Sequence, residues 1–296
     1  MIYDIRHVTR FDYGGAVKFA RCNLRLKPII WSGQMLERYR LTIAPSGRTY
    51  PARAEAGLAN VTRLVIEEPV RQLTIESVSR LVVDRLVPVP SPDDPTLGEI
   101  AAAACASRDP SPAGAANYLF PSPLIPLDRE IAAWCAQELD PDRPCLEAAI
   151  ALARRIQAEF TFDAEATLVD TPPHEAFVKR GGVCQDFAQI MITGLRAAGL
   201  PAAYASGYIR TIPPPGQPRL VGADATHAWV LLWCGAARGW VGVDPTNGIW
   251  MAGDHIVMAI GRDYGEIAPI DGVLLGAGGQ KMTVSVDVAP LEEVAA

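Results

Sequence analysis

The sequence predicts an α+β protein in which a small all-β domain precedes a mixed domain of helices and strands. Two observations support this prediction. Residues 1–84 alternate apolar and polar side chains with the two-residue period of strands. From residue 128 onward, helix-capping signals and helical spacing come first, and three strand-like runs follow them.

The N-terminal region has the pattern of several strands joined by turns. Tyr3, Ile5 and Phe11 line one face of the first run, and similar alternation recurs at 35–43 and 73–83. Turn signals such as Pro45-Ser46-Gly47 separate the runs. Residues 1–84 are therefore expected to form a β-sandwich-like domain.

A proline-rich connector is expected between the two domains. Residues 85–127 contain nine of the 25 prolines of the chain. Helix starts follow at Asp128, a good N-cap residue, and at Pro144, which suits a first helical turn. Residues 128–296 are assigned to the second domain.

Composition excludes some classes of partner. A net charge of −6 argues against nucleic acid and anionic membranes, because both attract basic surfaces. No apolar run approaches the roughly 18 residues of a spanning helix, and the first residues lack a signal-peptide layout. The six cysteines form no C-x-x-C motif or dense framework, which favours reduced thiols and a cytoplasmic location.

Cys184 is the first candidate for chemistry. Gly181 and Gly182 precede it, apolar residues follow it at helical spacing, and Gly199 ends the pattern. The pattern places Cys184 in the first turn of a helix, where the positive end of the helix dipole favours the thiolate. Taken alone, such a cysteine is more often a buried structural residue. Candidate partners change this interpretation.

Those partners are His227 and Asp244. Strands are predicted at 203–209, 226–233 and 239–244, with a proline-rich loop at 211–222 between the first two. If the last two strands form a hairpin with a four-residue loop, Trp233 lies opposite Arg238.

This register would place His227 directly opposite Asp244. The carboxylate would then fix the imidazole tautomer and leave the other ring nitrogen for the thiol. A solvated surface pair is the alternative, and the apolar residues Trp229 and Leu231 on the same face disfavour it.

Several motifs give the chain a resemblance to a known family. They are Gly-Gly-Val-Cys-Gln-Asp-Phe-Ala at 181–188, Ala-Thr-His-Ala-Trp at 225–229, Val-Asp-Pro-Thr-Asn-Gly at 243–248, His-Ile at 255–256 and Gly-Arg-Asp-Tyr at 261–264. With the β-rich N-terminal region, they resemble bacterial transglutaminase-like proteins, a group often described as cysteine proteases within the transglutaminase and papain-like superfamily.

The resemblance implies a papain-like or transglutaminase-like core with the cysteine helix packed on an antiparallel sheet. It also implies a catalytic triad of Cys184, His227 and Asp244 that uses no metal and no cofactor. Phe162 stands where many relatives have a tyrosine. The Cys184 backbone N–H is therefore the one donor assigned to an oxyanion hole.

The predicted function is cleavage of an amide or peptide bond in a peptide or protein, through a thioester on Cys184. Two alternatives stay open. Transfer of the acyl group to an amine, as in transglutaminase or N-acyltransferase chemistry, shares the first half-reaction. A catalytically inactive peptide-binding module would keep the same fold.

Overall fold

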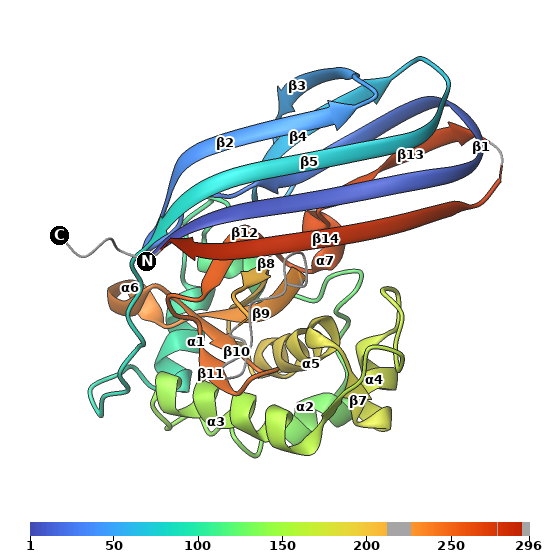
Figure 1. The fold of residues 1–296 in the computed structure, drawn as a ribbon. Coiled ribbons are helices and arrows are strands. Elements are labelled where there is room, and N and C mark those ends of the chain that lie inside the picture. Colours follow the sequence, from blue (N-terminus) through green and yellow to red (C-terminus); the bar gives the residue numbers. More distant parts are fainter. Residues whose placement is uncertain (212–225, 277, 292–296) are drawn as a thin grey trace, which may run out of the picture.

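Figure 1 shows a long β-sandwich that lies over a unit of helices and shorter strands. The structure is a computed structural model, and it describes residues 1–211, 226–276 and 278–291. The proline-rich loop predicted at 211–222 therefore lies, from residue 212 on, outside the described residues.

The described part of the sandwich contains strands from both ends of the chain: β1 (Ile2–Lys27), β2 (Gln34–Ala44), β3 (Arg48–Ala52), β4 (Leu58–Ile66), β5 (Val70–Val83), β13 (Ile270–Gly276) and β14 (Gln280–Leu291). β1 belongs to both layers. Its residues 2–12 pair with β5 and β14, and its residues 20–24 pair with β4 and β13. The predicted alternation is confirmed, because Tyr3, Ile5 and Phe11 are buried.

The connector contains more regular structure than its prolines predicted. It includes helix α1 (Leu97–Cys105) and the short 3-10 helix η1 (Ala115–Tyr118). α1 begins with a capping box: the Thr96 hydroxyl accepts the Glu99 N–H at 3.2 Å, and the Glu99 carboxylate accepts the Thr96 N–H at 2.8 Å. The helix buries Leu97 and Ile100 in the core of the helical unit.

The helical unit surrounds one buried helix, α5 (Cys184–Ala197). α5 packs against α2 (Arg129–Cys135) on one side and against strands β8 and β9 on another. Asp128 caps α2, and Pro144 precedes α3, as the sequence predicted. The other elements are α3 (Cys145–Glu159), β6 (Thr161–Phe162), α4 (Pro173–Lys179), β7 (Gly181–Gly182), β8 (Ala202–Ile209), β9 (Thr226–Trp233), α6 (Gly235–Arg238), β10 (Trp240–Asp244), β11 (Ile249–Trp250), β12 (His255–Gly261) and α7 (Tyr264–Ile267).

The sheet beside α5 is antiparallel, with β10, β9, β8 and β12 as neighbours. A cysteine helix packed on an antiparallel sheet, after an all-β N-terminal region, is the arrangement that the sequence predicted. The α+β fold class is therefore confirmed. Among the described residues, no helix is long and apolar enough to span a bilayer.

The two units are joined more closely than the predicted boundaries imply. Strand β12 pairs with β4 at Ala259 and Ile260, so a single sheet runs from β11 to β2. A shared core also joins them, with Tyr3 and Val288 from the sandwich and Tyr208 and Ile256 from the helical unit.

Two features of the predicted division need correction. The second domain was expected to extend over 128–296, but β13 and β14 complete the sandwich by pairing with β1. The first domain was expected to be separate, but β4 also joins the sheet that carries His227. Pairings between strands that are hundreds of residues apart leave no local periodicity, so the sequence pattern could not reveal them.

Candidate active site

Cys184 occupies the first position of α5, in the first helical turn as predicted, and it is partly exposed. Asp186 braces this turn, because its Oδ2 accepts the Val183 N–H at 2.8 Å and the Thr167 hydroxyl at 2.6 Å. The amides of the first helical turn have no acceptor inside the helix, so the Cys184 N–H needs an acceptor from outside it.

Gly182 makes this arrangement possible. A Cβ atom at residue 182 would lie 2.4 Å from Asp186 Oδ2, closer than any ordinary contact. Only glycine therefore lets the bracing carboxylate approach the chain immediately before Cys184. Phe162 pairs with Gly182 in the short β6–β7 ladder and brings no hydroxyl to the site.

His227 and Asp244 meet on neighbouring strands, although not in the predicted register. Trp233 pairs with Trp240 rather than with Arg238, because residues 235–238 form the short helix α6 instead of a simple loop. Asp244 is thus two residues away from the position opposite His227. The imidazole Nε2 still lies 2.8 Å from Asp244 Oδ2, which confirms the predicted hydrogen bond.

Asp244 is fully buried and is surrounded by donors. Its Oδ1 accepts the backbone N–H groups of Thr246 at 2.9 Å and Asn247 at 3.3 Å. Its Oδ2 accepts the Asn247 side-chain amide at 2.7 Å and lies 3.3 Å from His255 Nε2. Asn247 was not predicted as a site residue, and His255 was expected from its motif to shape the site rather than to take part in catalysis. Asn247 had a local signal, since an Asp followed by Pro-Thr-Asn-Gly is typical of a turn around a carboxylate.

Charge and hydrogen bonding set the ionisation of this pair. Burial alone would raise the pKa of Asp244, but the hydrogen bonds from His227, His255 and Asn247 and the charge of His227 hold it well below its usual range. Burial alone would lower the pKa of His227, whereas its interactions with Asp244 and Cys184 raise it to about 10. The geometry therefore favours an imidazolium against a carboxylate.

The remaining ring nitrogen of His227 is Nδ1, because Nε2 is bound to Asp244. The interaction between the Cys184 thiol and His227 contributes to the raised pKa of the imidazole. Trp229 covers the ring, with centroids 6.0 Å apart and planes 30° apart. The imidazole is 8% exposed, so its orientation is fixed by its neighbours.

His227, Asp244 and His255 could also form a metal-ligand set, since their donor atoms lie within 4.8 Å of one another. The hydrogen bonds argue for another use. His255 Nδ1 accepts the Ala252 N–H at 3.4 Å, so His255 Nε2 carries the proton and points it at Asp244. A nitrogen that carries a proton has no lone pair for a metal, and the donor set fits hydrogen bonding.

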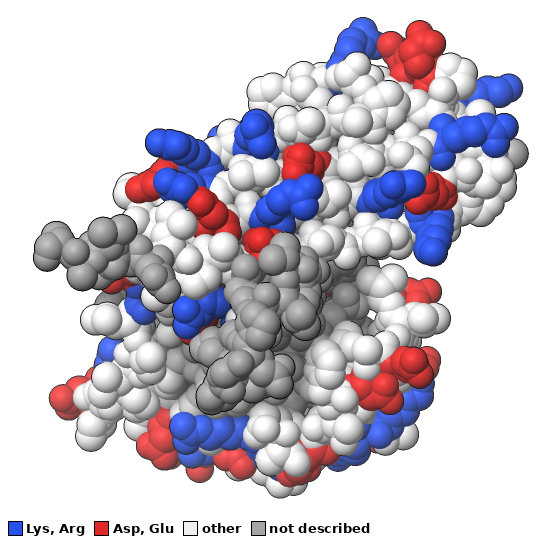
Figure 2. Space-filling view, viewed as in Figure 1, with Lys and Arg blue, Asp and Glu red and all other residues white. Residues whose placement is uncertain are grey.

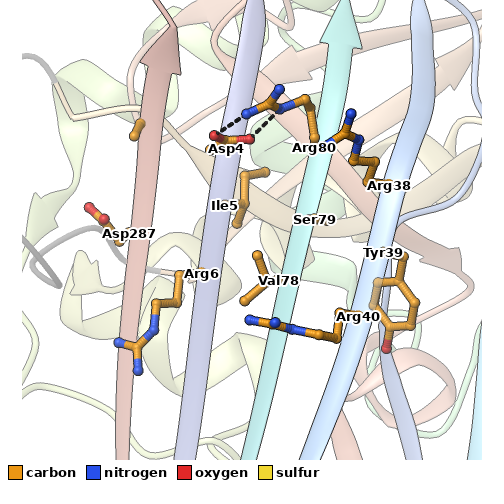
Figure 3. Close-up of a pocket in the computed structure, with 11 residues that line it drawn as sticks. Asp4, Ile5, Arg6, Arg38, Tyr39, Arg40, Val78, Ser79, Arg80 and Asp287 are labelled. Atoms are coloured by element: carbon orange, nitrogen blue, oxygen red, sulfur yellow. Dashed lines mark hydrogen bonds and ion pairs between the residues drawn. The ribbon is translucent and has the colours of Figure 1, made fainter.

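A separate concave region lies on the outer face of the sandwich. It has a volume of about 670 Å³, and Figure 3 shows the arginine side chains of strands β1, β2 and β5 around it: Arg6, Arg38, Arg40 and Arg80. Arg80 forms a two-bond ion pair with Asp4 at 2.7 Å. In Figure 2, basic and acidic side chains alternate over this part of the surface. The residues that line this region include no cysteine or histidine.

Comparisons with known proteins match both the N-terminal strands and the part of the chain that carries the site. A family model described as "Transglutaminase-like superfamily" matches residues 130–245, which include Cys184, His227 and Asp244. A second, described as "Bacterial transglutaminase-like N-terminal region", matches residues 3–82. An uncharacterized protein of Mycobacterium tuberculosis (strain ATCC 25618 / H37Rv) is 36% identical over 299 residues, which cover 98% of this chain and 93% of the relative. The chain belongs to the transglutaminase-like superfamily.

Two further proteins resemble this transglutaminase-like chain. A crystal structure from Cytophaga hutchinsonii, named "putative cysteine protease", has a TM-score of 0.78 at 18% identity and covers 99% of this chain and 91% of its own. At this identity the likeness concerns the transglutaminase-like fold alone. A Pseudomonas aeruginosa protein named protein-glutamine gamma-glutamyltransferase is 38% identical over 100 residues, which are 32% of this chain and 15% of that protein.

Proposed function

We propose that this transglutaminase-like chain is an enzyme that cleaves an amide or peptide bond through a thioester on Cys184. The observation that carries the proposal is the buried His227–Asp244 hydrogen bond of 2.8 Å, which orients the imidazole and leaves Nδ1 for the thiol. An oriented imidazole beside a partly exposed cysteine at a helix N-terminus is the arrangement that nucleophilic catalysis requires.

The reaction begins when the Cys184 thiolate attacks the substrate carbonyl carbon. The Cys184 N–H and the positive end of α5 stabilise the negative oxygen that forms. Imidazolium His227 gives its proton to the leaving amine, and Asp244 holds the ring in place. Neutral His227 then accepts a proton from water, whose oxygen attacks the thioester. A carboxylic acid is released, and the Cys184 thiolate and the His227 imidazolium are restored.

A second candidate is transfer of the acyl group to an amine. The similarity over 100 residues to a protein-glutamine gamma-glutamyltransferase favours it. Both reactions share the thioester, and they differ in whether water or an amine attacks it. A peptide-binding module without turnover is the third possibility, and it predicts no thioester.

The proposed substrate is a peptide or a protein amide, with no nucleic-acid or membrane partner. The net charge of −6 supports the exclusion of polyanions.

We further propose a reducing, cytoplasmic environment. All six cysteines are free thiols, which supports this assignment.

The test is a search for a covalent acyl adduct on Cys184. The purified chain is incubated with a peptide mixture, quenched in acid, digested and analysed by mass spectrometry. We expect an acyl mass on the peptide that contains Cys184, absent from Cys184→Ala and retained in the matched variant Cys105→Ser, which changes an exposed thiol. An added primary amine that appears in the product identifies transfer. No adduct under any condition would favour the binding module.

A further inference from the structure

His255 is a buried donor that faces Asp244 from strand β12. It is 1% exposed, and its Nε2 lies 3.3 Å from Asp244 Oδ2. Its Nδ1 accepts the Ala252 N–H at 3.4 Å, which fixes the tautomer. The Trp229 ring meets it edge-on, with centroids 5.2 Å apart. Both imidazoles therefore point a nitrogen at the same carboxylate oxygen.

The segment that carries His255 is held by side chains that precede the helical unit in the chain. Gln34, at the start of β2, is 4% exposed and forms two hydrogen bonds with Val257: its amide donates to the Val257 carbonyl at 2.8 Å, and its carbonyl accepts the Val257 N–H at 2.8 Å. One side chain thus replaces the neighbouring strand that the edge of β12 lacks at this point.

Two more N-terminal side chains hold the turn before His255. Arg85, which follows β5, donates to the carbonyl of His255 at 3.0 Å and to that of Ala252 at 3.2 Å. The Tyr3 hydroxyl lies 2.9 Å from Asp254 Oδ1 and 3.0 Å from the Gly253 carbonyl oxygen, and it donates its proton to this pair of acceptors. Residues 252–257 are therefore held by Tyr3 and Gln34 of the N-terminal domain, by Arg85 at the start of the connector and by the Ala252–His255 contacts.

We propose that the N-terminal region positions the catalytic carboxylate, with Gln34 and Arg85 acting through His255 on Asp244. This inference rests on the proposed function of Cys184, His227 and Asp244. The physical reason is geometric. Asp244 Oδ2 must lie within hydrogen-bond reach of His227, and His255 restricts its movement from the other side. His255 itself can do this only while its backbone is held.

The test compares four variants of the full chain. His255→Leu removes the donor, and His255→Gln keeps an amide that can donate. Gln34→Met keeps the length of the side chain and removes both bonds to Val257. Arg40→Gln is the matched control on β2, since Arg40 is exposed on the outer face shown in Figure 3.

The first readout is the rate of Cys184 alkylation by iodoacetamide between pH 5 and pH 9. We expect His255→Leu to lower the rate at pH 6 by about tenfold. Gln34→Met should lower it in the same direction by a smaller factor, and His255→Gln should recover most of the loss. Arg40→Gln should match the native profile. Native profiles for both His255→Leu and Gln34→Met would overturn the proposal. If His255→Leu does not fold, Gln34→Met decides the case.

The second readout does not depend on catalysis. With only four histidines in the chain, ¹⁵N-histidine labelling gives few imidazole signals to assign. We expect Gln34→Met to move the His227 Nε2–H resonance, which reports the bond to Asp244. An unchanged resonance would refute the positioning role. A shifted resonance in a protein whose Cys184 reacts like an ordinary thiol would instead support positioning and refute the proposed function.

Discussion

At the scale of single residues, the orientation of His227 depends on Asp244. It is a fully buried carboxylate whose two oxygens accept hydrogen bonds from three side chains and two backbone amides. Such a group costs much to bury unless each of its oxygens is satisfied. The donors keep Asp244 ionised, and the ionised carboxylate keeps His227 protonated.

The expected reactivity of Cys184 follows from the positive charge of His227. An ordinary thiol, with a pKa of about 8.5, is roughly 0.3% thiolate at pH 6. An imidazolium beside Cys184 and the dipole of α5 both favour the thiolate. Alkylation at pH 6, with labelled peptides quantified by mass spectrometry, should therefore modify Cys184 at least about tenfold faster than Cys105, which is exposed at the end of α1. His227→Ala should abolish the preference, and Asp244→Asn should weaken it less.

The direction in which pH changes the preferential alkylation of Cys184 follows from the pKa of His227. The pKa of His227 is raised from about 6.5 to about 10, so its positive charge is present at pH 6 and is lost as the pH rises through about 10. The faster labelling of Cys184 relative to Cys105 should therefore be present at pH 6 and should be lost as the pH rises through about 10. Equal labelling of both cysteines at pH 6 in the folded protein would contradict the proposed nucleophile.

At the scale of elements, the β9–β10 hairpin shows what sequence reasoning can and cannot supply. Both strands and the Cys184 helix were predicted from periodicity. The loop was assumed to have four residues, whereas α6 shifts the register by two. Because side chains alternate with a period of two, a shift of two residues keeps His227 and Asp244 on the same face of the sheet. They are diagonal rather than directly opposite neighbours, and the imidazole still reaches the carboxylate. His255 lies on a third strand, β12; its motif pointed to the site, but no local pattern predicted its contact with Asp244.

The start of α5 gives a prediction about stability and reactivity together. In Gly182→Ala the new methyl group would displace the Asp186 carboxylate from the Val183 N–H. We expect a loss of about 1–3 kcal/mol in the free energy of unfolding, the usual cost of overpacking. Slower alkylation of Cys184 should accompany it. Denaturant titration and the alkylation rate measure the two effects.

Gly279→Ala is the control for this experiment. A Cβ atom at residue 279 meets no other atom within 4 Å, so the free energy of unfolding should change by less than about 0.5 kcal/mol. A Gly182→Ala protein that is as stable and as reactive as Gly279→Ala would show that Asp186 does not brace the cysteine turn.

At the scale of the whole molecule, strands from the two ends of the chain pair with each other. β13 and β14 return from the helical unit to pair with β1, and β4 joins the sheet that carries His227. A core of sandwich and helical-unit residues lies at this junction, with Leu81 and Val286 on one side and Met258 on the other. The predicted boundaries followed composition, which changes at the prolines, whereas the packing follows the strand pairings.

The shared sheet and the shared core predict that both units unfold in a single cooperative transition. Five of the six tryptophans, at positions 134, 229, 233, 240 and 250, lie in the helical unit, so their fluorescence reports that unit. Far-UV circular dichroism also reports the long strands of the sandwich. In a guanidinium titration both signals should change with the same midpoint and the same slope, because neither unit can keep its share of the junction core alone. Gln34→Met should lower both midpoints equally. A sandwich that stays folded after the tryptophan signal is lost would establish two independent domains and restore the division that composition suggested.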